Sequence, residues 1–173
     1  MEVTIEITSW CDKGCSYCST NASEDGEPLP YKDIDEFLKD KKKVDRINIS
    51  GGEPLSHPDF WKILNLCYSY TQNVWIYTNA IRNIIYNSSV IKNINVDANV
   101  CIVPGTEVFV PAGVRKVHLL KLVRQGRAKD IPEQDMKVSG NMSGSCDRCE
   151  ECNHILLQAD GQVVKAPCKK LYD

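Results

Sequence analysis

The 173-residue sequence lacks any uninterrupted apolar run near the roughly 18 residues that a membrane-spanning helix needs. It also has little net charge, −2 at pH 7, from 21 basic and 23 acidic side chains. A chain with so small a charge has no global basic field, so bulk electrostatic attraction to nucleic acid is not expected. Internal repeats and low-complexity tracts are absent as well. We therefore expect no membrane protein, and the sequence gives no indication of nucleic-acid binding, although it leaves room for a local basic patch.

Cysteine, in contrast, is plentiful, with nine residues. Because Met1 runs directly into a strand-like segment, we expect no secretory leader and a soluble protein of the reducing cytoplasm. In that compartment thiols serve as metal or cluster ligands more often than as disulfides. The length allows one main domain and a small appendage.

Apolar periodicity predicts strands that alternate with helices. Residues 3–7 alternate apolar and polar side chains as a strand does, and apolar residues recur at helical spacing from Ile34, with Asp33 as the expected N-cap. Further strands are expected at 44–49, 74–77, 96–103 and 117–123, and further helices at 60–68 and 84–94. Alternating strands and helices indicate an α/β fold with a parallel sheet.

Three cysteines directly after the first strand carry the most information. Cys11, Cys15 and Cys18 have the spacing CxxxCxxC, and Gly14 lets the loop turn between them. Three thiolates can ligate three irons of a [4Fe–4S] cluster and leave the fourth iron open to a substrate. Zinc is the alternative, although structural zinc takes four ligands and no fourth lies nearby in the sequence.

The loop, with Tyr17 before its last cysteine, resembles the signature of the radical S-adenosylmethionine (radical SAM) superfamily. The segment Ser50-Gly51-Gly52-Glu53-Pro54, which ends an apolar run, looks like the GGEP segment of that family. The usual fold of the family is a partial barrel of six βα units. Only four or five strands can be placed here, so the resemblance implies a truncated partial (β/α) barrel over residues 1–138.

The resemblance also implies how the cofactors bind. S-adenosylmethionine would chelate the open iron, the backbone around Gly51 and Gly52 would receive its amino group, and Tyr17 would lie beside its adenine. We expect a side chain at Gly52 to crowd the methionine moiety while leaving the iron content unchanged. Asn79 follows a strand, and Arg124 or Arg127 lies beyond another, where ligands bind in such folds. The expected cofactor-binding residues are thus Tyr17, Gly51, Gly52, Glu53, Pro54, Asn79 and Arg124.

A second cysteine set follows a flexible linker at 139–145. Cys146, Cys149 and Cys152 have the spacing CxxCxxC, and Cys168 follows a proline, which is like ferredoxin-type ligation of a closed [4Fe–4S] cluster. Between them, Asp160-Gly161 separates two apolar runs and predicts a β-hairpin. This arrangement is similar to the Twitch and SPASM auxiliary-cluster extensions of radical SAM enzymes, here over residues 139–173. A zinc ribbon is the alternative.

The remaining cysteines and the histidines predict no further site. Cys67 and Cys101 fall on apolar faces of expected elements and are interpreted as buried hydrophobic residues. The three histidines do not form a ligand set; they are His57, His118 and His154.

The function implied by the resemblance is reductive cleavage of S-adenosylmethionine to a 5′-deoxyadenosyl radical, which abstracts hydrogen from the substrate. An electron donor such as flavodoxin or ferredoxin is implied as a partner. A truncated barrel would be open at its side, which favours a bulky substrate such as a peptide or protein. Three alternatives stay open: an activase of glycyl-radical enzymes, an enzyme that modifies nucleotides or small metabolites, and a non-catalytic iron–sulfur or zinc module.

The C-terminal cysteines generate a first testable prediction. Replacing Cys146, Cys149, Cys152 and Cys168 by alanine should lower the iron content of anaerobically reconstituted protein from about eight to about four irons per chain. Uncoupled cleavage of S-adenosylmethionine should persist, because a closed cluster binds no cofactor, while turnover of the true substrate should be lost. About four irons and one zinc in the unaltered protein would instead identify a zinc ribbon.

Overall fold

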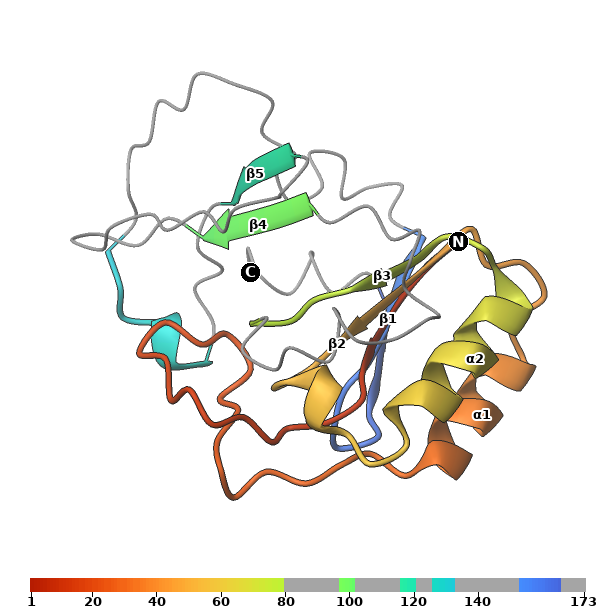
Figure 1. Ribbon diagram of the computed structural model, residues 1–173, viewed down its shortest axis with the longest axis horizontal. Helices are drawn as coiled ribbons and strands as arrows, with labels where there is room; N and C mark the ends of the chain where they lie inside the picture. Colours follow the sequence, from red (N-terminus) through yellow and green to blue (C-terminus); the bar gives the residue numbers. More distant parts are fainter. Residues whose placement is uncertain (80–96, 102–115, 121–125, 133–152, 166–173) are drawn as a thin grey trace.

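The computed structural model describes residues 1–79, 97–101, 116–120, 126–132 and 153–165. Two helices cover one face of a five-stranded sheet, and two further strands form a separate small sheet (Figure 1). The elements of the main sheet and its helices are β1 Glu2–Glu6, α1 Tyr31–Lys39, β2 Arg46–Ser50, α2 Phe60–Tyr70, β3 Val74–Ile76, β6 His154–Leu157 and β7 Val163–Lys165. The small sheet consists of β4 Asp97–Cys101 and β5 Lys116–Leu120, and two 3-10 turns are η1 Pro54–Ser56 and η3 Gly126–Ala128.

These elements confirm the strands and helices that periodicity predicts within the described residues. The expected helix at 84–94 and the linker at 139–145 lie outside them. The prediction of Asp33 as a helix cap is wrong: α1 begins at Tyr31, and Pro30 is its N-cap. Proline suits a helix start, because the N–H groups there have no partner within the helix and proline has none. Asp33 instead places a negative charge in the first turn of the helix.

The main sheet has the strand order β3-β2-β1-β6-β7. β3, β2, β1 and β6 run parallel, with Val3 opposite both Ile47 and Ile155, and only β7 is antiparallel. The strands β6 and β7 flank a turn in which the Gln158 amide donates to the Gln162 carbonyl at 2.8 Å. The C-terminal hairpin thus adds to the same sheet as β1, an arrangement that no local sequence pattern predicts.

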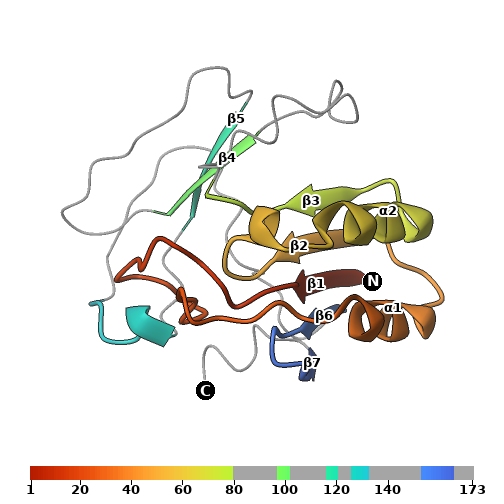
Figure 2. The same ribbon diagram turned by 60° about the horizontal axis from the view of Figure 1, so that its bottom comes forward.

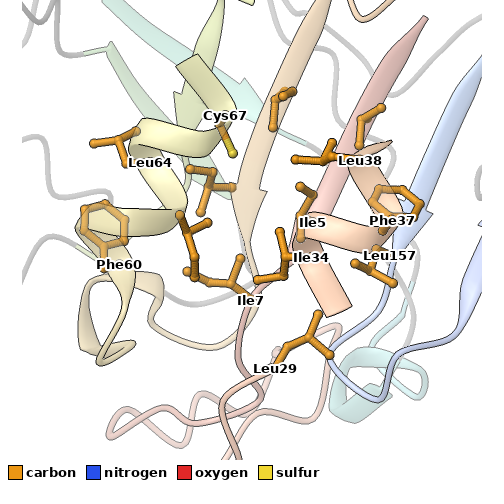
Figure 3. Packing of buried hydrophobic residues seen from close by; sticks show 14 of the residues in the cluster. Ile5, Ile7, Leu29, Ile34, Phe37, Leu38, Phe60, Leu64, Cys67 and Leu157 are labelled. Carbon is orange, nitrogen blue, oxygen red and sulfur yellow. The ribbon is translucent and has the colours of Figure 1, made fainter. Parts of the chain in front are cut away.

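The hydrophobic core lies between the sheet and its two helices (Figures 2 and 3). Alternate side chains of β1 and β2 point to it, and the helices contribute their apolar stripes. Its fully buried members include Ile5, Ile34, Leu38, Ile49 and Ile63. Cys67 lies among them, and burial raises the pKa of its thiol to about 12, which confirms that this cysteine acts as a buried hydrophobic residue.

The other face of the sheet is polar. The Glu2 carboxylate pairs with Arg46 and accepts a hydrogen bond from Asn48 Nδ2 at 2.7 Å. The Thr4 hydroxyl accepts a second hydrogen bond from the same Asn48 amide, and its oxygen lies 2.7 Å from His154 Nε2. This hydrogen-bond network therefore crosses from β2 through β1 to β6. Hydrogen bonding therefore adds to the backbone ladder in holding the C-terminal hairpin to the sheet.

No helix in the described part of the chain is long and apolar enough to span a bilayer.

The core generates a stability prediction. Ile34→Ala should lower the free energy of unfolding by about 2–5 kcal/mol, because it leaves a cavity at a fully buried position between α1 and the sheet. Urea unfolding of the apoprotein followed by circular dichroism would measure it. Lys32→Ala is the control, since it removes only an exposed ion pair with Glu36 and should change stability by less than about 1 kcal/mol.

Candidate functional site

The three-cysteine loop begins where β1 ends. A parallel bridge between Trp10 and Ser23 joins its two ends, with the Cys11 amide donating to the Ser23 carbonyl at 2.8 Å and the Ser23 amide donating to the Ser9 carbonyl at 3.1 Å. Gly14 has φ +53 and lies in open space, so the left-handed turn between the first two cysteines suits glycine. The thiols of Cys11, Cys15 and Cys18 are unoxidised and half-buried.

The environment of the thiols differs along the loop. Burial raises the pKa of the Cys11 thiol. Burial alone would also raise that of Cys18, but hydrogen bonds from Thr20 and Ala22 and the charge of Arg127 outweigh it, so the pKa of this thiol lies below its usual value. The Cys18 thiol therefore loses its proton more readily than an ordinary cysteine, and the thiolate is the form that binds iron.

The GGEP segment packs directly on the start of this loop. The Gly52 amide donates to the Thr8 carbonyl at 2.7 Å, and the Glu53 amide donates to the Trp10 carbonyl at 2.8 Å. A Cβ at Gly52 would lie 2.0 Å from the Trp10 oxygen, and one at Gly51, whose φ is +125, would lie 2.3 Å from the Thr8 oxygen. Both glycines are thus required by contact between two backbone segments.

This contact changes the expectation for Gly52. The sequence predicts that an added side chain would crowd the methionine moiety and spare the iron. In the structure the added atom meets the backbone of Trp10, next to the first cysteine of the loop. A substitution there therefore disturbs the position of Cys11 before it reaches any cofactor.

Glu53 lies in the interior, with 1 % of its surface exposed. Its carboxylate accepts hydrogen bonds from the Leu55 amide at 3.0 Å, the Thr78 hydroxyl at 2.7 Å and the Asn79 amide at 2.9 Å. It thereby ties the end of β2 to the residues after β3. Because these bonds occupy the carboxylate, the backbone of the GGEP segment is left as the acceptor expected for the amino group. Pro54 is also buried, at the first position of η1.

The structure brings Asn79 to the cysteine loop. The Asn79 Nδ2 atom lies 4.0 Å from the Cys11 sulfur, at the outer limit of a sulfur hydrogen bond. Thr78, which the sequence analysis missed, lies beside it and holds Glu53. The only feature of the sequence that could have indicated a role for Thr78 is its position just after a strand. Tyr17 is half-buried within the loop.

Of the two basic candidates, Arg124 lies outside the described residues. Arg127 contacts the cysteine loop instead of standing open to a ligand. Its Nε donates to the Cys15 carbonyl and its Nη2 to the Ala22 carbonyl, each at 2.8 Å.

The histidines are structural where the structure describes their side chains. The Nδ1 atom of His57 accepts from the Asp59 amide, so its Nε2 donates to the Leu29 carbonyl at 2.9 Å. His154 belongs to the polar sheet network, and burial lowers its pKa. The second cysteine set lies outside the described residues: Cys146, Cys149, Cys152 and Cys168.

The donor set of the loop fits a cluster better than a single metal ion. Among the described residues, no three histidine, cysteine or acidic side chains are arranged to hold one ion. A [4Fe–4S] cluster makes no such demand, because each thiolate binds a different iron. Three half-buried thiols on one loop fit that requirement, and N–H groups close to the sulfurs supply the hydrogen bonds that tune such clusters.

A family model described as the radical SAM superfamily matches residues 5–96, more than half of the chain. The match includes the three loop cysteines and the GGEP segment. The chain belongs to the radical SAM superfamily. Members of this superfamily are enzymes that use a [4Fe–4S] cluster and S-adenosylmethionine.

Two curated relatives each match a little under half of the chain. An S-adenosylmethionine-dependent nucleotide dehydratase of Selenomonas ruminantium is 35% identical over 80 residues, which is 45% of this chain and 29% of the relative. The mycofactocin maturase MftC of Mycobacterium ulcerans is 29% identical over 83 residues, 46% of this chain and 22% of the relative. The chain therefore matches less than a third of either protein.

A solved structure has a similar fold over most of the chain. BtrN in complex with AdoMet and 2-DOIA aligns with a TM-score of 0.58 and 22% identity, over 94% of this chain and 71% of that one. At this identity the likeness is one of fold. The two proteins therefore share the mixed α/β arrangement with its parallel sheet.

The glycine contact generates a prediction for the radical SAM site. Gly52→Ala should lower the iron content after anaerobic reconstitution and weaken S-adenosylmethionine binding, because the new Cβ must push Trp10 and Cys11 aside at a cost of about 1–3 kcal/mol. Iron analysis and isothermal titration would measure the two effects. Gly161→Ala is the control: nothing lies within 4 Å of its added carbon, and its own φ of +82 makes it a demanding site for alanine in a turn away from the cysteine loop. Normal iron with weak cofactor binding would restore the original expectation.

Proposed function

We propose that this chain is a radical SAM enzyme that reductively cleaves S-adenosylmethionine and uses the resulting radical to abstract hydrogen from a substrate. One observation supports this most directly: Thr8 and Trp10, which lead into the CxxxCxxC loop, accept backbone hydrogen bonds from Gly52 and Glu53 of the GGEP segment, more than 40 residues further along the sequence. They do so at the carboxyl ends of neighbouring parallel strands, where α/β folds bind their ligands (Figure 2).

Each part of the site has a role in this proposal. Cys11, Cys15 and Cys18 each bind one iron, and the fourth iron is left for the amino and carboxylate groups of S-adenosylmethionine. A reduced cluster held by these cysteines would supply the one electron that reductive cleavage of the cofactor requires. The backbone of Gly51 and Gly52 is the proposed acceptor for the amino group. Asn79 lies close enough to Cys11 to orient that ligand.

The substrate belongs to the proposal as well. The relatives are named for different substrates, a nucleotide in one and mycofactocin in the other, so the family does not select one. Both edges of the described five-stranded sheet are three-residue strands, β3 and β7, and the sheet does not close on itself. An open sheet favours the truncated barrel expected from the sequence and a bulky substrate such as a peptide or protein.

A second, auxiliary cluster of Twitch type completes the proposal. Cys152 and Cys168 stand two residues before β6 and three residues after β7 in the sequence. Because β6 and β7 are antiparallel, with Ile155 opposite Lys165, these two ends of the hairpin lie side by side. This supports a single site for the C-terminal cysteines. An electron donor such as flavodoxin or ferredoxin and a reducing cytoplasm are consistent with both clusters.

Replacement of the three loop cysteines tests the proposed function. The variant with alanine at Cys11, Cys15 and Cys18 should form no 5′-deoxyadenosine under dithionite, because no iron remains open to the cofactor. Product analysis by liquid chromatography and mass spectrometry, with iron analysis, would measure this. Cys67→Ala is the control, since it removes a thiol that the core buries far from the loop, and it should retain the activity. Product formation by the triple variant, or none by the unaltered protein with its cluster loaded, would refute the proposal.

A further inference from the structure

We propose that Arg127 is a positioning residue that holds the three-cysteine loop in its ligand-binding conformation and keeps a positive charge beside the cluster. This inference rests on one part of the proposed function, namely that the three-cysteine loop binds an iron–sulfur cluster. Its basis is a set of contacts between residues more than 100 positions apart in the sequence.

The contacts join both the backbone and the side chain of one residue to the loop. The Arg127 amide donates to the Cys18 carbonyl at 2.9 Å. Its guanidinium donates to the Cys15 carbonyl through Nε and to the Ala22 carbonyl through Nη2, both at 2.8 Å. A single residue thus binds three carbonyl groups, two of which belong to cluster-ligand cysteines.

The preceding glycine allows this approach. Gly126 has φ +54, and a Cβ there would lie 2.7 Å from the carbonyl oxygens of Cys18 and Ser19. No other residue type fits so close to the loop without displacing it. The turn η3 as a whole lies against the loop in both ribbon views (Figures 1 and 2).

The hydrogen-bond geometry of the Arg127 guanidinium distinguishes a positioning role from a ligand-binding role. An arginine that binds a carboxylate presents two parallel N–H groups to it. Here Nε and Nη2 point to two different carbonyls of the chain, so the fork is divided between two parts of the loop. Lysine, with a single ammonium group on a flexible stem, lacks this fixed divided geometry.

The loop needs such support because its own sequence supplies little. Between Cys11 and Ser23 it consists mostly of small or polar residues, which bury little apolar surface. Hydrogen bonds from a charged donor stabilise a structure more than those from a neutral donor. The charge has a second effect, because reduction adds an electron to the cluster and a nearby cation favours the reduced state.

The test compares three variants of the full chain with the unaltered protein. Arg127→Gln removes the fork and the charge, Arg127→Lys removes the fork and keeps the charge, and Gly126→Ala displaces the turn while keeping Arg127. Lys129→Gln is the matched control, because it removes an exposed charge two residues away.

The first measurement uses apoprotein and follows amide hydrogen exchange of a peptide that spans residues 11–23. In the two Arg127 variants and in Gly126→Ala, the amides of this peptide should exchange at least about tenfold faster. That factor corresponds to the loss of one charged hydrogen bond. Exchange in α1 and β1 should stay unchanged. Lys129→Gln should match the unaltered protein. Equal exchange of this peptide in all proteins would overturn the positioning role.

The second measurement uses cluster-loaded protein and follows the midpoint potential by electron paramagnetic resonance. Arg127→Gln should have a more negative potential, and Arg127→Lys a potential near that of the unaltered protein. Equal potentials in Arg127→Gln and the unaltered protein would overturn the charge effect. If the unaltered protein binds no [4Fe–4S] cluster, the proposed function fails, while the exchange measurement on apoprotein still decides whether Arg127 positions the loop.

Discussion

The close approach of two backbone segments, Gly51–Glu53 and Thr8–Trp10, is the constraint on which the rest of the site depends. Their hydrogen bonds of 2.7 and 2.8 Å extend the pairing of β1 with β2 beyond the last strand residues. Any side chain at either glycine would enter the opposite backbone. The two motifs therefore act as one structural unit, and the glycines are needed for packing whether or not they also touch the cofactor.

The hydrophobic core fixes the strands from which this unit extends. Ile5 and Ile49 are opposite each other in β1 and β2, and both are fully buried beneath the helices. A slip of one residue would turn these side chains to the polar face, so burial specifies the register. The register in turn sets where each strand ends, and Glu53 adds β3 to the arrangement through Thr78 and Asn79. The placement of the loop is thus determined by packing some distance from it.

Much of the described fold is predictable from local patterns. Alternation and helical spacing suffice for β1, β2, α1 and α2, because each buries one face against the same core. The first residue of α1 cannot be predicted in this way, because Asp33 and Pro30 both suit a helix start and tertiary packing decides between them. The position of β6 beside β1 is also beyond local patterns, because parallel pairing over about 150 residues leaves no mark on either strand alone.

In the candidate site, local sequence also fails to predict what the charged residues bind. Glu53 and Arg127 both look like ligand-binding groups in the sequence, since each is charged and follows a strand. In the structure the carboxylate binds three donors of the chain and the guanidinium binds two carbonyls. The physical reason is common to both: loops of small polar residues bury too little apolar surface to stay in place, so charge-assisted hydrogen bonds must hold them. A charged residue next to such a loop therefore has two competing uses, and only the partners of its polar atoms distinguish them.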